Sequence, residues 1–97
     1  MRDELREQIT TIVAQIPVGR VTTYGAIAKM TAGATARSVG AALRTLPAGH
    51  GLPWHRVVSA GGRLAAHGGA DEQRQRLLSE GIIFDRRGRI PAHYLWP

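Results

Sequence analysis

The sequence predicts a single, mainly α-helical domain with small β hairpins, spanning residues 1–97. Three observations favour this fold class. A length of 97 residues allows one modest hydrophobic core. A hydrophobic fraction of 43% is ordinary for a folded chain. Apolar residues recur at helical spacing in several segments, and glycine and proline separate these segments.

The first element is an amphipathic helix at about residues 3–16. Asp3 and Glu4 fall in its first turn, where negative charge suits the helix dipole. The apolar stripe consists of Leu5, Ile9, Ile12, Val13 and Ile16. Pro17 and Gly19 then predict a turn, because proline fixes φ and glycine permits positive φ.

Residues 21–46 predict two short helices joined by a turn. Thr22 or Thr23 can cap the first helix, which runs to about Met30, and the second runs from about 34 or 35 to Leu46. The apolar side of the second helix is Val39, Ala42, Leu43 and Leu46. Its opposite side is Arg37, Gly40, Ala41 and Arg44. The pattern is typical of a helix-turn-helix that reads DNA, but a helical hairpin with solvated arginines would look the same.

The stretch from Pro53 to Val58 predicts a short strand with a polar-rimmed aromatic pocket at its start. Residues 56–58 and 62–64 resemble a hairpin around the turn 60–62, which makes the whole a winged helix-turn-helix. A further helix is expected at 71–81 and a second hairpin at 82–84 and 89–90. The aromatic residues near position 95 are expected to dock on the body.

The charge is strongly segregated. The net charge is +6, and all seven acidic residues lie before residue 8 or after residue 70. The acid-free span between them carries six lysine or arginine residues. A surface of one sign favours a polyanionic partner, and nucleic acid is the commonest one.

Composition also excludes several classes of function. The chain contains no cysteine, which removes disulfides, thiolate metal sites and a thiol nucleophile. Neither a membrane-spanning run nor a secretory signal is present, so we expect a cytoplasmic protein without membrane contact, associated with the nucleoid when bound to DNA. The four histidines are too scattered to predict a metal site, and no cofactor is expected.

Three blocks in order resemble the O6-alkylguanine-DNA alkyltransferase family. They are Ile16-Pro17-x-Gly19-x-Val21-x-Thr23-Tyr24-Gly25-x-Ile27-Ala28, Ala36-Arg37-Ser38-Val39-Gly40 and Pro53-Trp54-His55-Arg56-Val57, followed downstream by Leu77-Leu78-x-Glu80-Gly81. In the transferases a cysteine that accepts the alkyl group stands where this chain has Trp54. An indole has no thiolate equivalent, so self-alkylation is excluded. With tryptophan at this position, the chain is similar to the alkyltransferase-like proteins, which bind O6-alkylguanine in DNA and direct it to nucleotide excision repair.

The resemblance implies a role for each matching residue. Tyr24 would rotate a nucleotide out of the duplex, and Arg37 would fill the place that it leaves in the stack. The recognition helix would face the minor groove with Ala36, Ser38, Gly40, Ala41 and Arg44. The lesion pocket would be formed by Pro53, Trp54, His55, Arg56, Val57 and His67, the last on a loop that closes over the base. The implied partners are double-stranded DNA containing O6-alkylguanine and nucleotide excision repair proteins such as UvrA, and the protein would be a monomer.

Two other functions fit parts of the pattern. A winged-helix transcriptional regulator would bind one specific operator, but it would need a dimer interface that the sequence does not display. An enzyme using His55 as a base would need an acid or nucleophile beside it, and the sequence shows no such partner.

Overall fold

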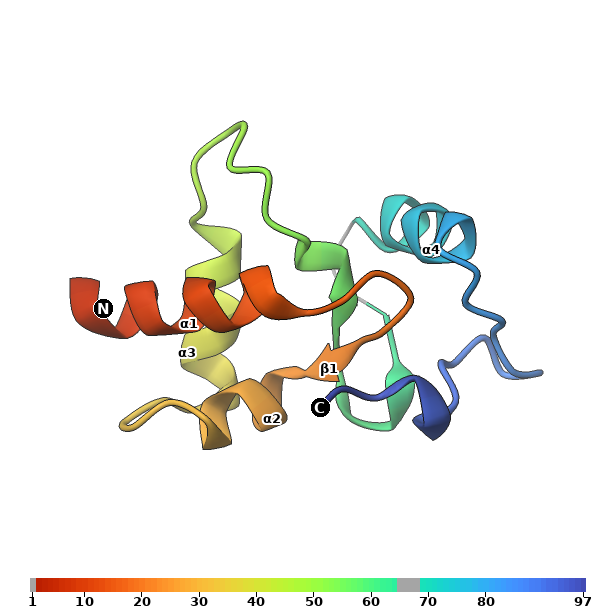
Figure 1. Cartoon of the computed structure of the whole chain (residues 1–97), viewed down its shortest axis with the longest axis horizontal. Helices are drawn as coiled ribbons and strands as arrows, with labels where there is room; N and C mark the ends of the chain where they lie inside the picture. The colour runs from red at the N-terminus through yellow and green to blue at the C-terminus, as the bar shows by residue number, and fades with distance from the viewer. Residues whose placement is uncertain (1, 65–68) are drawn as a thin grey trace.

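The computed structural model describes residues 2–64 and 69–97, and the chain folds as helices around a minimal sheet (Figure 1). The α-helices are α1 (Asp3–Gln15), α2 (Tyr24–Lys29), α3 (Ala36–Arg44) and α4 (Ala70–Ser79). The short 3₁₀ helices are η1 (Trp54–Arg56), η2 (Ala60–Gly62) and η3 (Ala92–Tyr94), and the strands are β1 (Thr22–Thr23) and β2 (Val57–Val58). The mainly helical fold class is therefore confirmed.

The core consists of two clusters on either side of the small sheet. The first joins α1, α2, α3 and β2 through Ile9, Val13, Ile16, Ile27, Val39, Ala42 and Val57. The second joins the residue before β1, strand β2, α4 and the C-terminal segment through Val21, Val58, Leu77, Ile82 and Ile90. The stripes predicted from helical spacing on α1 and α3 are the ones that are buried.

The β structure differs from the predicted hairpins. Strands β1 and β2 pair in parallel, with Thr22 opposite Val57 and Thr23 opposite Val58. The predicted first hairpin is reduced to one antiparallel bridge between Ser59 and Arg63, which closes a turn that we call the wing turn (residues 59–63). Valines 57 and 58 pair with a distant segment instead, because that pairing buries both of them completely.

The predicted second hairpin, residues 82–84 with 89–90, is a turn without strands. The Asp85 side chain accepts hydrogen bonds from the backbone N–H groups of Arg87 (2.8 Å) and Arg89 (3.0 Å). The N–H of Ile90 donates to the carbonyl of Gly62 in the wing turn (3.0 Å). One backbone bond crosses the turn, from the N–H of Asp85 to the carbonyl of Arg89 (2.9 Å). The N–H groups of Arg89 and Ile90 are used by a side chain and by another segment, so the pairing does not extend into strands.

The C-terminal aromatic segment docks as predicted. The N–H of Val21 donates to the carbonyl of Tyr94 (3.0 Å), and the N–H of Trp96 donates to the carbonyl of Val21 (2.8 Å). The Trp96 side chain packs on the first core cluster. Within the described residues, no helix combines the length and hydrophobicity needed to cross a membrane.

Candidate nucleic-acid interface

Helix α3 begins with a complete capping box. The Thr35 hydroxyl accepts from the N–H of Ser38 (3.2 Å), and the Ser38 hydroxyl accepts from the N–H of Thr35 (2.8 Å). Such a box stabilises a helix start by satisfying otherwise unpaired N–H groups. Ser38, predicted to face DNA, therefore also fixes the first turn of α3, from which Ala36 and Arg37 extend into solvent.

The arginine side of α3 is arranged around Gly40. A Cβ atom on Gly40 would lie 3.2 Å from a terminal nitrogen of Arg44, so the Arg44 side chain runs back over the glycine and buries it. Ala41 is half-buried beside it. The Arg44 guanidinium thus lies close to Gly40, and a side chain at this position would press on it.

Tyr24 is the first residue of α2, and it lies beside the same arginine. The helix is capped by Thr23, whose hydroxyl accepts from the N–H of Ala26 (3.0 Å). Burial raises the pKa of the Tyr24 hydroxyl, and the positive charge of Arg44 partly opposes that rise. The packing of α2 on α3 therefore places Arg44 near enough for its charge to act on Tyr24, and both residues were predicted separately as DNA-facing.

Trp54 lies in the 3₁₀ turn η1 rather than at the start of a strand. The turn is closed by the N–H of Arg56, which donates to the carbonyl of Pro53 (3.0 Å). The indole is half-buried and meets the His55 ring edge-on, with 6.2 Å between centroids. The Arg76 guanidinium of α4 lies over the indole, 5.9 Å from its centroid. The Trp54 side chain thus extends from η1 to Arg76 of α4, and strand β2 begins only at Val57.

Behind Trp54, one carboxylate binds both neighbouring polar residues. Glu80, just after α4, accepts from the Arg56 side chain at 2.8–3.1 Å and lies 2.7 Å from the Nε2 of His55. It also accepts from the N–H of Gly19 (2.8 Å). Burial opposes the charge of Glu80, but the hydrogen bonds from Arg56, Gly19 and His55 outweigh burial and lower its pKa to about 2. The group is a compact charged cluster that fixes η1 against α4 and the α1–β1 turn.

Glu80 corrects the expectation that His55 lacks a partner acid. The pair could not be read from spacing, because the two residues are 25 positions apart. The sequence did contain one signal for this pair, the block Leu77-Leu78-x-Glu80-Gly81, in which Glu80 is the one ionisable residue. His55 is almost fully buried, and its Nδ1 has no hydrogen-bond partner within the described part of the chain.

One residue predicted for the lesion pocket is part of the core instead. Val57 is fully buried in the first core cluster, so it supports η1 from below and does not line an open surface. His67 falls outside the described residues. Arg56 is also directed inward, since it donates to the carbonyl of Ile16 (2.9 Å) as well as to Glu80. Among the described residues of the predicted pocket, the accessible part is therefore Trp54 with its neighbour Pro53, both half-buried.

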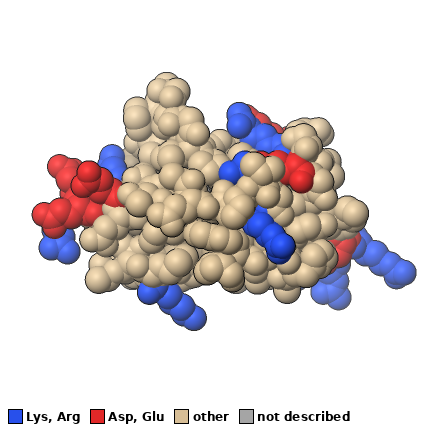
Figure 2. All heavy atoms as spheres, viewed as in Figure 1, with Lys and Arg blue, Asp and Glu red and all other residues tan. Residues whose placement is uncertain are grey.

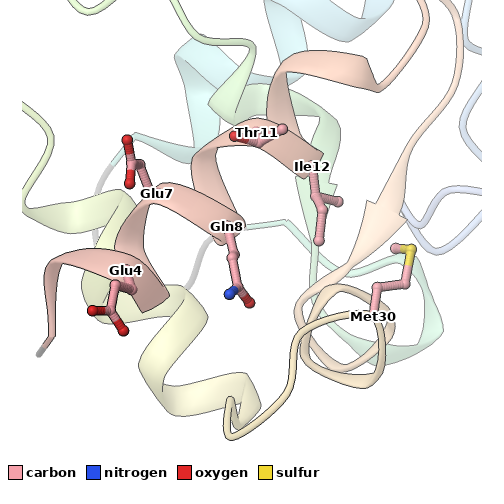
Figure 3. A pocket seen from close by; sticks show the side chains of 6 residues that line it. All are labelled: Glu4, Glu7, Gln8, Thr11, Ile12 and Met30. Atoms are coloured by element: carbon pink, nitrogen blue, oxygen red, sulfur yellow. The ribbon is translucent and has the colours of Figure 1, made fainter.

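An open groove of about 600 Å³ lies elsewhere, between α1 and the end of α2 (Figure 3). Glu4 and Glu7 line it together with Gln8, Thr11, Ile12 and Met30. Figure 2 shows carboxylates gathered at this end of the molecule, over the start of α1. Two carboxylates repel a polyanion, so this groove is not the nucleic-acid interface.

The fold and the site define a DNA-binding domain. Residues 4–82 match the family model described as 6-O-methylguanine DNA methyltransferase, DNA binding domain, and the chain belongs to this family. Its relatives place it among the alkyltransferase-like members. It is 43% identical over 97 residues to the DNA base-flipping protein of Escherichia coli, covering 97% of this chain and 75% of that protein. It is 36% identical over 84 residues to alkyltransferase-like protein 1 of Schizosaccharomyces pombe, covering 82% and 78%.

Solved structures agree with this placement. The crystal structure of S. pombe Atl1 in complex with damaged DNA containing O6-carboxymethylguanine matches with a TM-score of 0.86 and 32% identity, covering 100% of this chain and 98% of that one. The structure of Mycobacterium tuberculosis O6-methylguanine methyltransferase matches with a TM-score of 0.67 and 32% identity, covering 95% of this chain and 53% of the enzyme. This chain thus corresponds to about half of the transferase.

Proposed function

We propose that this protein is a non-enzymatic sensor of O6-alkylguanine in double-stranded DNA. The helix-turn-helix formed by α2 and α3 docks in the minor groove, and the damaged nucleotide is extruded into a site walled by Trp54. The observation that carries the proposal is the position of Trp54. It is an accessible aromatic held in η1 beside the charged His55–Arg56–Glu80 cluster. The damaged DNA in the Atl1 complex supports the same class of ligand.

The proposal assigns each step of extrusion to particular side chains. Flipping a nucleotide costs a few kcal/mol of unstacking, and the cost is lowest for a damaged base whose pairing is already weak. Arg37 extends from the exposed first turn of α3 and fills the gap in the stack. In this proposal the Tyr24 hydroxyl and the Arg44 guanidinium, which are near enough to interact electrostatically, bind the phosphates of the flipped nucleotide. Stacking on Trp54 returns ~1–3 kcal/mol.

The same site argues against catalysis of alkyl transfer. His55 and Glu80 form a pair that could activate a neighbouring nucleophile. The chain has no thiol to activate, and the residue before His55 is Trp54, whose indole nitrogen is a donor only. In this protein, the pair has the structural role of fixing η1, while Trp54 binds the base without reacting.

A sensor that leaves the lesion unchanged must hand it to other proteins. We place it upstream of nucleotide excision repair, with UvrA as the partner, acting as a cytoplasmic monomer that is nucleoid-associated when bound to DNA. Repair proteins that recognise distorted DNA can accept such a complex, because an extruded nucleotide and an inserted arginine distort the duplex. Reconstituted incision of an O6-methylguanine duplex should then rise when the protein is added. Unchanged incision would remove this partner from the proposal.

The central experiment is a binding titration at fixed salt with two duplexes that differ only in one O6-methylguanine. Salt must be fixed because a charge of +6 guarantees some affinity for any DNA. The proposal expects tighter binding of the damaged duplex and no alkyl group on the protein by mass spectrometry. Equal affinity for both duplexes would reject it. A symmetric footprint at one specific operator would instead support a transcriptional regulator.

A further inference from the structure

A second cationic surface lies in the segment between α4 and η3. We call residues 85–89 the arginine turn. Its single acid is used internally, since Asp85 accepts from the N–H groups of Arg87 and Arg89, and its own N–H donates to the carbonyl of Arg89 (2.9 Å). The side chains of Arg86 and Arg87 are left exposed at the tip.

Two more arginines flank this turn. The Arg74 guanidinium of α4 stacks over the Phe84 ring, 5.0 Å from its centroid, and lies 3.7–3.8 Å from where a Cβ on Gly88 would stand. Arg89 reaches back to Gly61 of the wing turn, 4.0 Å from the corresponding Cβ position. Within residues 2–64 and 69–97, the ion pairs are formed by His55, Arg56 and Arg76, and none includes an arginine of this turn or its flanks. Asp85 is therefore the one carboxylate of a cluster with four guanidinium groups, those of Arg74, Arg86, Arg87 and Arg89. The cluster is strongly cationic.

The arginine turn is fixed to the frame of the DNA-binding domain. Ile90, directly after it, donates to the carbonyl of Gly62, and a Cβ on Gly62 would lie only 2.2 Å from the carbonyl oxygen of Ile90. The wing turn in turn follows η1 and β2, which carry Trp54. Figure 2 shows Lys and Arg side chains projecting at the right-hand end, where this segment lies in Figure 1. The cluster therefore has a set position relative to the predicted interface.

We propose that the arginine turn is a second phosphate-binding surface, which contacts the backbone of the same duplex several base pairs from the extruded nucleotide. The inference rests on the proposed function, because it takes DNA as the partner. Continuity with the wing turn favours DNA over an acidic protein. The long axis of the molecule, 39 Å, matches roughly 11 base pairs of duplex, so both surfaces fit on one DNA segment. The backbone N–H groups of Arg87, Gly88 and Arg89 already donate to Asp85, so the turn binds through its side chains. Contacts to phosphate carry no sequence information, so this binding is independent of sequence.

The test compares salt dependence in Arg86→Ala, Arg87→Ala and the double variant. Affinities are measured by fluorescence anisotropy on a duplex of roughly 24 base pairs, about two helical turns, between about 50 and 200 mM salt. Each lost phosphate contact should reduce the slope of log affinity against log salt by about one. The ratio of affinities for damaged and undamaged DNA should not change, because these arginines do not touch the base. On a duplex of about 8 base pairs centred on the lesion, variant and unaltered protein should bind alike, since the distal phosphates are missing.

Arg2→Ala is the matched control. It removes the same charge from an exposed position at the start of α1, beside the acidic end, and should leave the slope nearly unchanged. Equal slopes for the double variant and the unaltered protein would overturn the inference, and so would an equal effect of Arg2→Ala. An acidic protein partner for this turn would produce that unchanged DNA slope. Failure of the proposed function would give a different result from failure of this inference: the unaltered protein would bind damaged and undamaged duplexes with equal affinity.

Discussion

Replacement of Glu80 by glutamine isolates the charge at the centre of the site. The glutamine side chain has nearly the same shape and can still accept from the N–H of Gly19. It loses the negative charge, and its amide nitrogen would face the donors of Arg56, which already point at this position. Buried pairs that lose one partner are strongly destabilised, because the remaining charge stays buried and unpaired.

The magnitude follows from the pKa of Glu80. Its fall from 4.5 to about 2 corresponds, at about 1.4 kcal/mol for each pH unit, to roughly 3 kcal/mol of stability at neutral pH. The side chain retains 12% exposure, so residual solvation brings the expected loss to about 2–3 kcal/mol. Because the folded pKa is depressed, this stabilisation is complete above about pH 4.5. It is lost as the pH falls through about 2.

Urea denaturation at several pH values between 7 and 2.5 tests the prediction. The difference between the unaltered protein and Glu80→Gln should be largest at pH 7 and shrink below about pH 4.5. Glu72→Gln is the control, because its ion pair with Arg76 is half-exposed and should contribute less than ~1 kcal/mol. If both variants lose the same stability at pH 7, or if the Glu80→Gln loss persists unchanged to pH 3, the reasoning is refuted.

Five further substitutions test the fold and the interface. Gly62→Ala places a Cβ against the backbone of Ile90 at positive φ and should cost more than ~3 kcal/mol in denaturation. Gly25→Ala, with nothing within 4 Å, should stay within ~1 kcal/mol, and a similar loss for both would contradict the close-approach argument. Arg37→Ala should reduce affinity for an O6-methylguanine duplex about tenfold or more without changing the denaturation midpoint; Tyr24→Phe should do so less. Trp54→Ala should narrow the affinity gap between damaged and undamaged duplexes by the ~1–3 kcal/mol of one stacked base, and an unchanged gap would place the base elsewhere.

Local pattern predicted the helical part of this fold. The spacing of Val39 and Ala42 correctly identified the buried side of α3, because helical periodicity is set within a few residues. The hairpins were wrong for the opposite reason. Strands of two residues carry no periodic signal, and the partner of Val57 is Thr22, 35 positions earlier. Pairing of that kind is decided by which long-range contact buries the most apolar surface.

The candidate site divides in the same way. The block around Trp54 was visible in the sequence because its residues are consecutive. Glu80 was missed as the partner of His55 and Arg56 because their contact exists only after α4 packs on η1. The closeness of Tyr24 to Arg44 likewise depends on how α2 crosses α3. Sequence spacing identifies which residues can act, and packing decides which of them act together.

The hydrogen bond from Gly19 to Glu80 makes a backbone amide into a reporter of the site. This N–H has a side-chain acceptor that belongs to the cluster behind Trp54, 61 residues further along the chain. Its proton can exchange with solvent only when that contact opens, so its protection factor measures the opening free energy of the cluster. Amide exchange at one glycine, followed by NMR during DNA titration, would therefore show whether a base entering the site tightens or loosens the frame that holds Trp54.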